Sequence, residues 1–217
     1  MIELNELSLA QRMFLLAYDP AHTRAAGRDK LGLVLNAAAL QGLLDGGFLT
    51  DDDGTAAPAG ARGAVPDDPL EAAVYARIGE SGRRRPWRHW VRKAEHRAVG
   101  TVREGLAQRR VLRLTPKRIL LVFPAHGIEL RQPRLRTEAM AGVRDALRGT
   151  LAPSRVPREC AASAVFAHVG GMRTVLSWRE RRETKARATG LALPLEPLPS
   201  ALRRAIRDKQ ATQNSGG

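Results

Sequence analysis

The chain has 217 residues, of which 43% are hydrophobic and 4% aromatic, and its formal net charge is +14. This hydrophobic content is enough to build a core, which excludes global disorder. Residues 1–80 contain 6 Lys and Arg against 12 Asp and Glu, a net charge of −6, whereas residues 81–217 contain 30 against 10, a net charge of +20. The basic second part points to a polyanionic partner: nucleic acid, an anionic membrane or an acidic protein.

Two helices are predicted near the N-terminus. Ser8 and Gln11 have the spacing of a capping box and predict a helix over about residues 8–18. Residues 30–45 predict a second helix that is apolar nearly all round, hence central, and that ends at two glycines. The pattern then predicts a short strand, an acidic turn and a Pro/Gly-rich loop over residues 48–69, and a third helix over residues 70–81.

The basic second part begins with a helical pattern. Residues 87–114 predict one long helix, or two helices broken near Gly100, because apolar residues recur at steps of three and four. Residues 111–130 predict a strand, a turn at Pro116 and a second strand, which can form a small hairpin. The remaining pattern predicts helices over residues 133–149, 158–171 and 173–189, an extended linker over 191–199 and a basic terminal helix over 200–213.

Targeting and redox features are few. The N-terminal segment is acidic, so we expect no signal peptide. Cys160 is the only cysteine, which excludes a disulfide within the chain and fits a reducing compartment, and we expect its thiol to be buried and inert. The longest uncharged run, residues 31–44, has 14 residues and is too short to span a bilayer. We therefore expect a soluble or peripheral protein.

Catalytic motifs are missing from the sequence. It contains no Gly-rich phosphate loop, no dinucleotide-binding fingerprint and no nucleophile elbow. Asp51, Asp53 and Gly54 resemble part of a calcium loop, but the acid that should close the loop is absent, which favours a solvated turn. The histidines His22, His89, His96, His126 and His168 lack metal-ligand spacing. We expect neither an enzyme nor a cofactor.

Trp87 and Trp90 alternate with arginines and therefore allow two interpretations. The rings could stack on nucleic-acid bases while the arginines bind phosphates. The rings could instead pack into the core at the start of a helix, with the arginines in solvent, and we prefer this interpretation because Trp is usually buried. A winged-helix nucleic-acid binder is the alternative function, yet residues 31–44 offer only Asn36 and Gln41 as polar side chains for base contacts.

The apolar run Ile119–Phe123 is flanked by basic residues. Lys117 and Arg118 precede it, and Arg131, Arg134 and Arg136 follow. The run is either an ordinary core strand or an outward-facing segment that contacts an anionic membrane, and the pattern alone leaves both interpretations open.

The order of these segments resembles the Golgi phosphoprotein 3 family, including its bacterial relatives. The similarity begins at LSLAQRMFLLAYD and continues through LNAAALQGLLDGGFLTDDDG, the Trp-led segment before TPKRILLVF, and RLRTEAMAGVRDAL. The resemblance implies a mainly α fold: a single globular helical domain, residues 5–190, with a protruding β-hairpin, followed by a basic C-terminal helix and tail, residues 191–217. Eukaryotic members of the family bind phosphatidylinositol 4-phosphate and help to retain glycosyltransferases.

The resemblance also implies site residues. The basic pair of the family's head-group pocket falls near Arg134 and Arg136, with Arg131 close by. The family's Trp falls near Gly27 and Arg28 and one Arg near Asn36, so the aromatic ring and that Arg are missing here. The implied head-group residues are Arg28, Arg131, Arg134 and Arg136, and the implied membrane-contacting hairpin residues are Leu120, Leu121, Val122 and Phe123.

These observations predict a non-enzymatic adaptor that lies peripherally on the cytoplasmic face of a membrane and binds anionic lipid head groups. The expected partners are an anionic phospholipid or phosphoinositide, the membrane surface, a membrane-protein client and a second copy of the chain. Nucleic acid is the partner under the alternative function.

Overall fold

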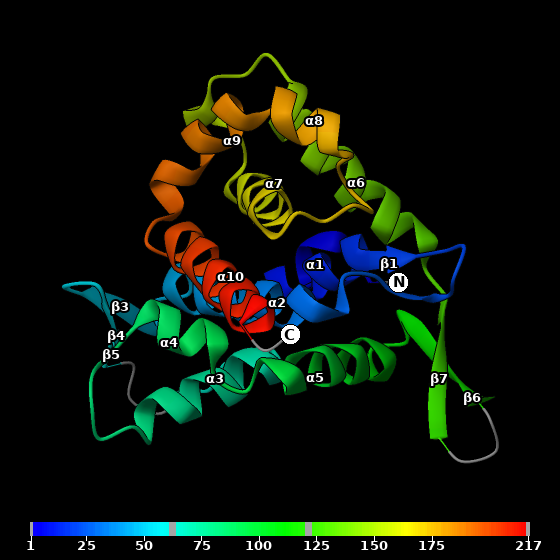
Figure 1. Ribbon diagram of the computed structural model, residues 1–217, viewed down its shortest axis with the longest axis horizontal. Helices are drawn as coiled ribbons and strands as arrows, with labels where there is room; N and C mark the ends of the chain where they lie inside the picture. Colours follow the sequence, from blue (N-terminus) through cyan, green and yellow to red (C-terminus); the bar gives the residue numbers. More distant parts are fainter. Residues whose placement is uncertain (1, 61–63, 120–122, 216–217) are drawn as a thin grey trace.

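Helix α2 (Arg28–Asp45) runs through the centre of the computed structural model, which describes residues 2–60, 64–119 and 123–215 (Figure 1). The fold is mainly α and forms a single domain, as predicted. The other helices are α1 (Leu9–Ala17), α3 (Pro69–Gly79), α4 (Trp87–Arg92), α5 (Glu95–Gln108), α6 (Pro133–Arg148), α7 (Arg158–Gly170), α8 (Trp178–Glu183), α9 (Lys185–Ala192) and α10 (Leu198–Asn214), with short 3-10 turns η1 (Leu4–Glu6), η2 (Pro153–Arg155) and η3 (Leu193–Leu195). The strands are β1 (Tyr18–Asp19), β2 (Arg24–Ala25), β3 (Leu49–Asp52), β4 (Thr55–Pro58), β5 (Arg85–Pro86), β6 (Leu112–Ile119) and β7 (Phe123–Leu130).

Burial of α2 on nearly all faces confirms the prediction for residues 31–44. The helix packs against α1, α3, α4, α5, α7 and α10. The two polar side chains of residues 31–44, Asn36 and Gln41, are also buried. Asn36 Nδ2 donates hydrogen bonds to the carbonyl oxygens of Val91 and Lys93, both at 3.0 Å. A helix enclosed in this way presents no face to a nucleic-acid groove, so α2 cannot act as a recognition helix.

The capping box before α1 is present. Gln11 N donates to Ser8 Oγ at 3.2 Å, and Ser8 N donates to Gln11 Oε1 at 3.3 Å. These two bonds satisfy backbone groups that the first turn leaves open, so the helix begins at Leu9.

The prediction of a break near Gly100 is wrong. The chain bends at Ala94, whose φ of +53° is left-handed, and Gly100 lies inside α5. The buried amide of Asn36 stabilises the bend because it pairs with carbonyl groups that the end of α4 leaves without helical partners. Trp87 and Trp90 are 2% and 4% exposed, which confirms that both rings pack into the core.

The strand pattern differs from the prediction in two places. The predicted strand after α2 is β3, but β4 pairs with it and β5 with β4, so a three-stranded antiparallel sheet replaces the expected loop. The hairpin of β6 and β7 is present, with Leu112 opposite Leu130 and Ile119 opposite Phe123. Pro116 is not its turn: it lies within β6 opposite His126, where a two-stranded ladder tolerates a residue without an N–H group.

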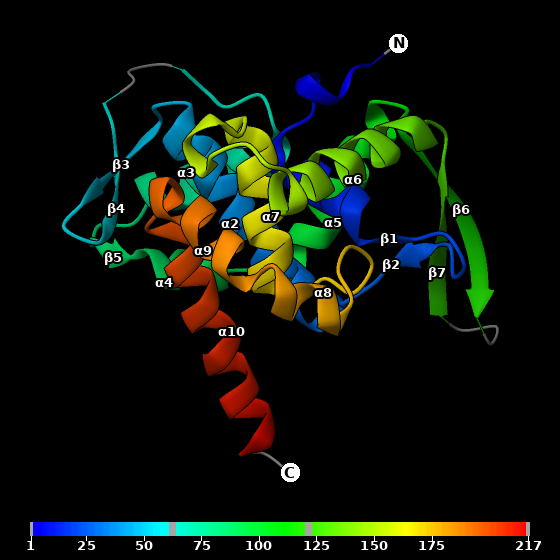
Figure 2. The same ribbon diagram turned by 90° about the horizontal axis from the view of Figure 1, so that it is seen from above.

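The C-terminal region holds two further corrections. The single helix predicted over residues 173–189 is two helices, α8 and α9, which meet at Thr184. The extended linker predicted over residues 191–199 is instead the end of α9, the turn η3 and the start of α10, and Leu191, Leu195 and Leu198 are buried. The first half of α10 packs on α2, α4 and α7, whereas residues 210–215 are exposed and project from the body (Figure 2).

Candidate functional site

The hairpin β6–β7 extends away from the helical body (Figures 1 and 2). A basic depression lies at its base. The depression has a volume of about 270 Å³. Its cationic side chains are Arg110, Arg113 and Arg131, and its remaining lining is Ala107, Leu112 and Leu114.

Backbone geometry brings the three arginines together. Arg110 follows α5 with a left-handed φ of +56°, and its N–H donates to the carbonyl of Ala107 at 2.9 Å. The chain then turns into β6. Where the chain leaves the hairpin, again at its base, Arg131 N donates to the carbonyl of Val111 at 3.0 Å. This bond holds the end of β7 beside the start of β6. Arg110 and Arg113 therefore line the same depression as Arg131, although Arg131 follows Arg110 by 21 positions in sequence.

The depression carries an excess of positive charge, although Glu129 on β7 lies opposite Arg113 in the hairpin register. Arg110, Arg113 and Arg131 are exposed, and none of the three forms an ion pair with a described acid. Three neighbouring guanidinium groups repel one another, and an anion bound between them would relieve that repulsion while accepting charge-assisted hydrogen bonds.

The hairpin base is rigidly attached to the body. Ile128 and Leu112 are buried. The Tyr18 hydroxyl donates to the carbonyl of Ile128 at 3.1 Å, and Ile128 N donates to the carbonyl of Thr23 at 3.0 Å. These contacts with β1 and the loop before β2 hold the strands, so the depression keeps its shape.

Arg134 and Arg136 open α6 but contact different parts of the molecule. Arg134 donates to the carbonyl of Ile2 at 2.6 Å and lies 3.6 Å from Glu138. Arg136 Nε donates to the carbonyl of Tyr18 at 3.2 Å. Residues two apart on a helix point about 200° away from each other, so the structure does not bring this pair onto one ligand, and it places Arg131 with Arg110 and Arg113 instead.

The family comparison agrees with this architecture. The model of the Golgi phosphoprotein 3 (GPP34) family matches residues 9–209. The chain belongs to the Golgi phosphoprotein 3 family. No curated protein matches the chain. In the described part of the chain, no helix is long and apolar enough to cross a membrane.

The start of α2 is the second place where the family resemblance implies a ligand. Arg28 is the first residue of α2 after Gly27, which caps the helix with a φ of +67° and whose carbonyl accepts from Leu31 N at 2.8 Å. A cavity of about 250 Å³ lies here and includes Gly27, Lys30 and Arg173 in its lining. Asn36, the position implied for a family Arg, is fully buried two turns further along and does not face this cavity.

The apolar hairpin residues of this Golgi phosphoprotein 3 family member fall at the limit of the description. Leu120, Leu121 and Val122 lie outside the described residues, and Phe123 is described only as the first backbone position of β7. Their contact with a membrane stays a prediction, as does head-group binding by Arg28, Arg131, Arg134 and Arg136.

Neither the Cys160 thiol nor a metal-ligand cluster forms a reactive site among the described residues. Cys160 is half-buried, and burial raises the pKa of its thiol, which disfavours the nucleophilic thiolate. Over residues 2–60, 64–119 and 123–215, no cluster of three His, Cys, Asp or Glu could hold a metal ion.

Sequence reasoning missed Arg110 and Arg113 as members of the depression. The available signal was their position on either side of the start of β6, in RRVLRL. Only the return of β7 shows that these residues share a surface with Arg131.

Proposed function

We propose that this protein is a peripheral membrane adaptor, not an enzyme, that binds anionic lipid head groups on the cytoplasmic face of a membrane. The observation that carries the proposal is the depression of Arg110, Arg113 and Arg131, exposed and without ion pairs among the described residues, at the base of a projecting hairpin. The resemblance to phosphatidylinositol 4-phosphate binders supports the same class of ligand.

The expected affinity is that of a reversible membrane protein. Each Lys or Arg near an anionic surface contributes about 1 kcal/mol, so the three arginines contribute about 3 kcal/mol. Each apolar side chain at the hairpin tip that leaves water completely adds at most about 1.5–3 kcal/mol. Neither contribution alone holds a protein on a membrane, whereas two such signals together do.

The other predicted head-group residues have secondary roles in the proposal. Arg28 stands at the N-terminus of α2, where backbone N–H groups and the helix dipole favour an anion. Arg134 and Arg136 would add to the positive potential around the hairpin rather than form one phosphate site, since their contacts diverge. A membrane-protein client and a second copy of the chain are further proposed partners.

Vesicle flotation tests the proposal. The protein should float with phosphatidylcholine vesicles that contain phosphatidylglycerol or phosphatidylinositol 4-phosphate, and should not float with pure phosphatidylcholine. Binding should weaken as salt rises, because exposed charges are screened beyond about 8–10 Å. A gel-shift assay with duplex DNA at matched salt is the comparison. Equal binding to neutral and anionic vesicles, or DNA binding without vesicle binding, would contradict the proposal.

A further inference from the structure

A second basic cavity lies between α7, α8, α9 and α10, apart from the hairpin. Its volume is about 510 Å³. The lining includes three side chains that give it an apolar wall, Val169, Ala188 and Ala192. The cationic side chains around it are Arg181, Arg182, Lys185 and Arg203. The lining also includes two ring side chains, Trp178 and His168.

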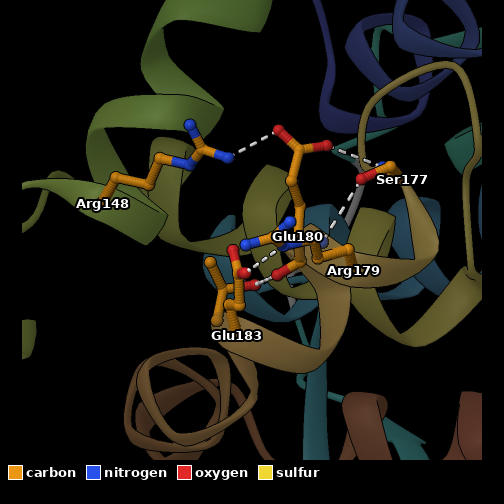
Figure 3. A network of polar contacts seen from close by, with 6 residues as sticks. Arg148, Ser177, Arg179, Glu180 and Glu183 are labelled. Carbon is orange, nitrogen blue, oxygen red and sulfur yellow. Dashed lines mark hydrogen bonds and ion pairs between the residues drawn. The ribbon is translucent and has the colours of Figure 1, made fainter.

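Trp178 is held in solvent by a well-anchored helix. Trp178 is 72% exposed, whereas Trp87 and Trp90 are buried. Helix α8 begins with a capping box, in which Glu180 N donates to Ser177 Oγ at 3.3 Å and Ser177 N donates to Glu180 Oε2 at 2.8 Å (Figure 3). Glu180 Oε1 also accepts from Arg148 on α6 at 2.6 Å. The exposed ring is therefore presented by a fixed element.

The acids of α8 already form ion pairs, whereas the cations of the cavity form none with a described acid. Glu180 pairs with Arg148, and Glu183 pairs with Arg179 at 2.8 Å (Figure 3). Among the described residues, no ion pair includes any of the four cavity cations, Arg181, Arg182, Lys185 and Arg203. The cavity thus carries four positive charges from three different helices with no internal counter-charge.

The lining also contains two other polar side chains, His168 and Thr189. His168 Nε2 lies 2.8 Å from the carbonyl oxygen of Arg181, which can only accept, so Nε2 carries the proton. Burial and the nearby cations lower the pKa of His168, although its hydrogen bond to the Arg181 carbonyl acts in the opposite direction. The lowered pKa favours the neutral ring, and the contact of Nε2 with the Arg181 carbonyl ties α7 to α8 at the edge of the cavity.

The position of α8 shows which side of the molecule the cavity shares with the hairpin. In Figure 2, α8, the exposed end of α10 and the strands β6 and β7 all extend toward the lower side of the view, where α10 projects furthest, whereas Figure 1 shows α8 and the hairpin strands at opposite ends of the molecule. A membrane that faces this lower side would approach both the hairpin strands and α8, which begins with Trp178. Tryptophan is enriched at membrane–water interfaces, where its ring lies at the level of the head groups, and Arg182 already lies over this ring at 5.7 Å.

We propose that this cavity is a second binding site for anionic phospholipid. Its cations bind the lipid phosphate, and Trp178 lies at the head-group level. The site and the hairpin together fix the orientation of the protein on the membrane. This inference rests on the proposed membrane function. A lipid fits better than a soluble anion because the cavity has an apolar wall and the exposed ring is apolar over most of its surface. Binding at two separated points would stop the protein from rotating about the hairpin.

Tryptophan fluorescence tests the inference directly. The chain has three tryptophans, and Trp178 alone among them is exposed. Vesicles of phosphatidylcholine with phosphatidylglycerol should shift the emission to shorter wavelength, and bromine-labelled lipids should quench it. Both effects should vanish in Trp178→Phe, which still floats.

A charge variant tests the cations. Arg181→Gln with Arg203→Gln should weaken vesicle binding about 30-fold, at about fivefold for each cation removed. The matched control is Arg83→Gln with Arg155→Gln, since both residues are exposed and neither lines this cavity or the hairpin depression. This control should bind as the wild type does.

The outcomes separate the two proposals. Wild-type protein that floats while its Trp178 emission stays unchanged, or a cavity variant that binds like the control, would overturn the second site and leave the membrane function standing. Wild-type protein that never floats would overturn both. A rise in melting temperature with inorganic phosphate alone that is lost in the cavity variant, without any effect of that variant on flotation, would assign the cavity to a soluble anion and overturn the lipid assignment.

Discussion

Replacing Glu71 with Gln should stabilise the protein at alkaline pH and leave its stability at acid pH nearly unchanged. Glu71 lies in the first turn of α3, and its carboxyl group packs against α2, where a Cβ added to Gly42 would be 2.3 Å from Glu71 Oε1. Burial, reinforced by Asp68, Asp45 and Asp67, raises the pKa of Glu71 from 4.5 to about 8. The folded protein therefore keeps a proton that the unfolded chain releases above pH 4.5.

The direction of the effect follows from proton binding. Between pH 4.5 and about 8 the folded state binds more protons than the unfolded state, so the free energy of unfolding falls as pH rises through this window. At about 1.4 kcal/mol for each pH unit, the loss between pH 5 and pH 8 is about 4 kcal/mol. Glu71→Gln removes the titration, so its advantage over the wild type should grow by about this amount over the same range.

Urea unfolding of the wild type, Glu71→Gln and Glu80→Gln at both pH values measures this difference. Glu80 follows the end of the same helix and is exposed, so its replacement controls for the loss of one carboxyl group. An advantage of Glu71→Gln that is equal at the two pH values would refute the reasoning. Loss of stability in Glu71→Gln at both values would also do so, because it would show that the carboxyl makes a needed contact.

Two further predictions concern packing and the hairpin. Gly32→Ala should cost about 1–3 kcal/mol of stability, because its Cβ would lie 2.2 Å from the backbone oxygen of Glu95. Gly100→Ala should gain about 0.5–1 kcal/mol, because its Cβ meets only Glu104 Oε1 at 3.9 Å. Equal unfolding midpoints for the two variants would contradict the close approach of α2 and α5. Of the two apolar pairs Leu120 with Val122 and Leu121 with Phe123, Asp at one pair should abolish flotation and leave the melting temperature intact, while Asp at the other should unfold the protein, because burying a charge in the core costs several kcal/mol. If both pairs prove necessary for folding, no apolar hairpin residue is free for a membrane.

Local patterns predicted the parts of the fold that short-range physics determines. The capping box at Ser8 and Gln11 and the uncharged run of residues 31–44 specify a helix start and a buried helix without reference to distant residues. Pro133 at the first turn of α6 belongs to the same class.

The predictions failed where a distant residue decides the outcome. The bend at Ala94 depends on Asn36, 58 residues earlier, and glycine was the wrong signal. Pro116 remains in a strand because β7 pairs beside it. The segment of residues 191–199 contains three prolines and suggested a linker, but Leu191, Leu195 and Leu198 are buried in the core.

The depression includes one of the four predicted head-group residues. Basic residues near an apolar hairpin were expected, and Arg131 is among the arginines of the depression. Arg110 and Arg113 join it only through the pairing of β6 with β7, and Arg134 and Arg136 diverge because of their spacing on α6. The cavity beside Trp178 assembles residues from four helices, which no local spacing in the sequence could indicate.

The most direct measurement of the central claim is the affinity of a charge-reversed depression for anionic vesicles. Arg113→Glu with Arg131→Glu should weaken binding to phosphatidylcholine vesicles containing phosphatidylglycerol by about a thousandfold, because each reversal removes about 1 kcal/mol of attraction and adds a similar repulsion. The control Arg83→Glu with Arg155→Glu makes the same change in net charge away from the depression, and it should retain most of the wild-type affinity. The melting temperatures of all three proteins should agree, since both depression arginines are exposed. Equal affinities for the depression variant and the control, at equal melting temperatures, would contradict the claim that this surface binds the membrane.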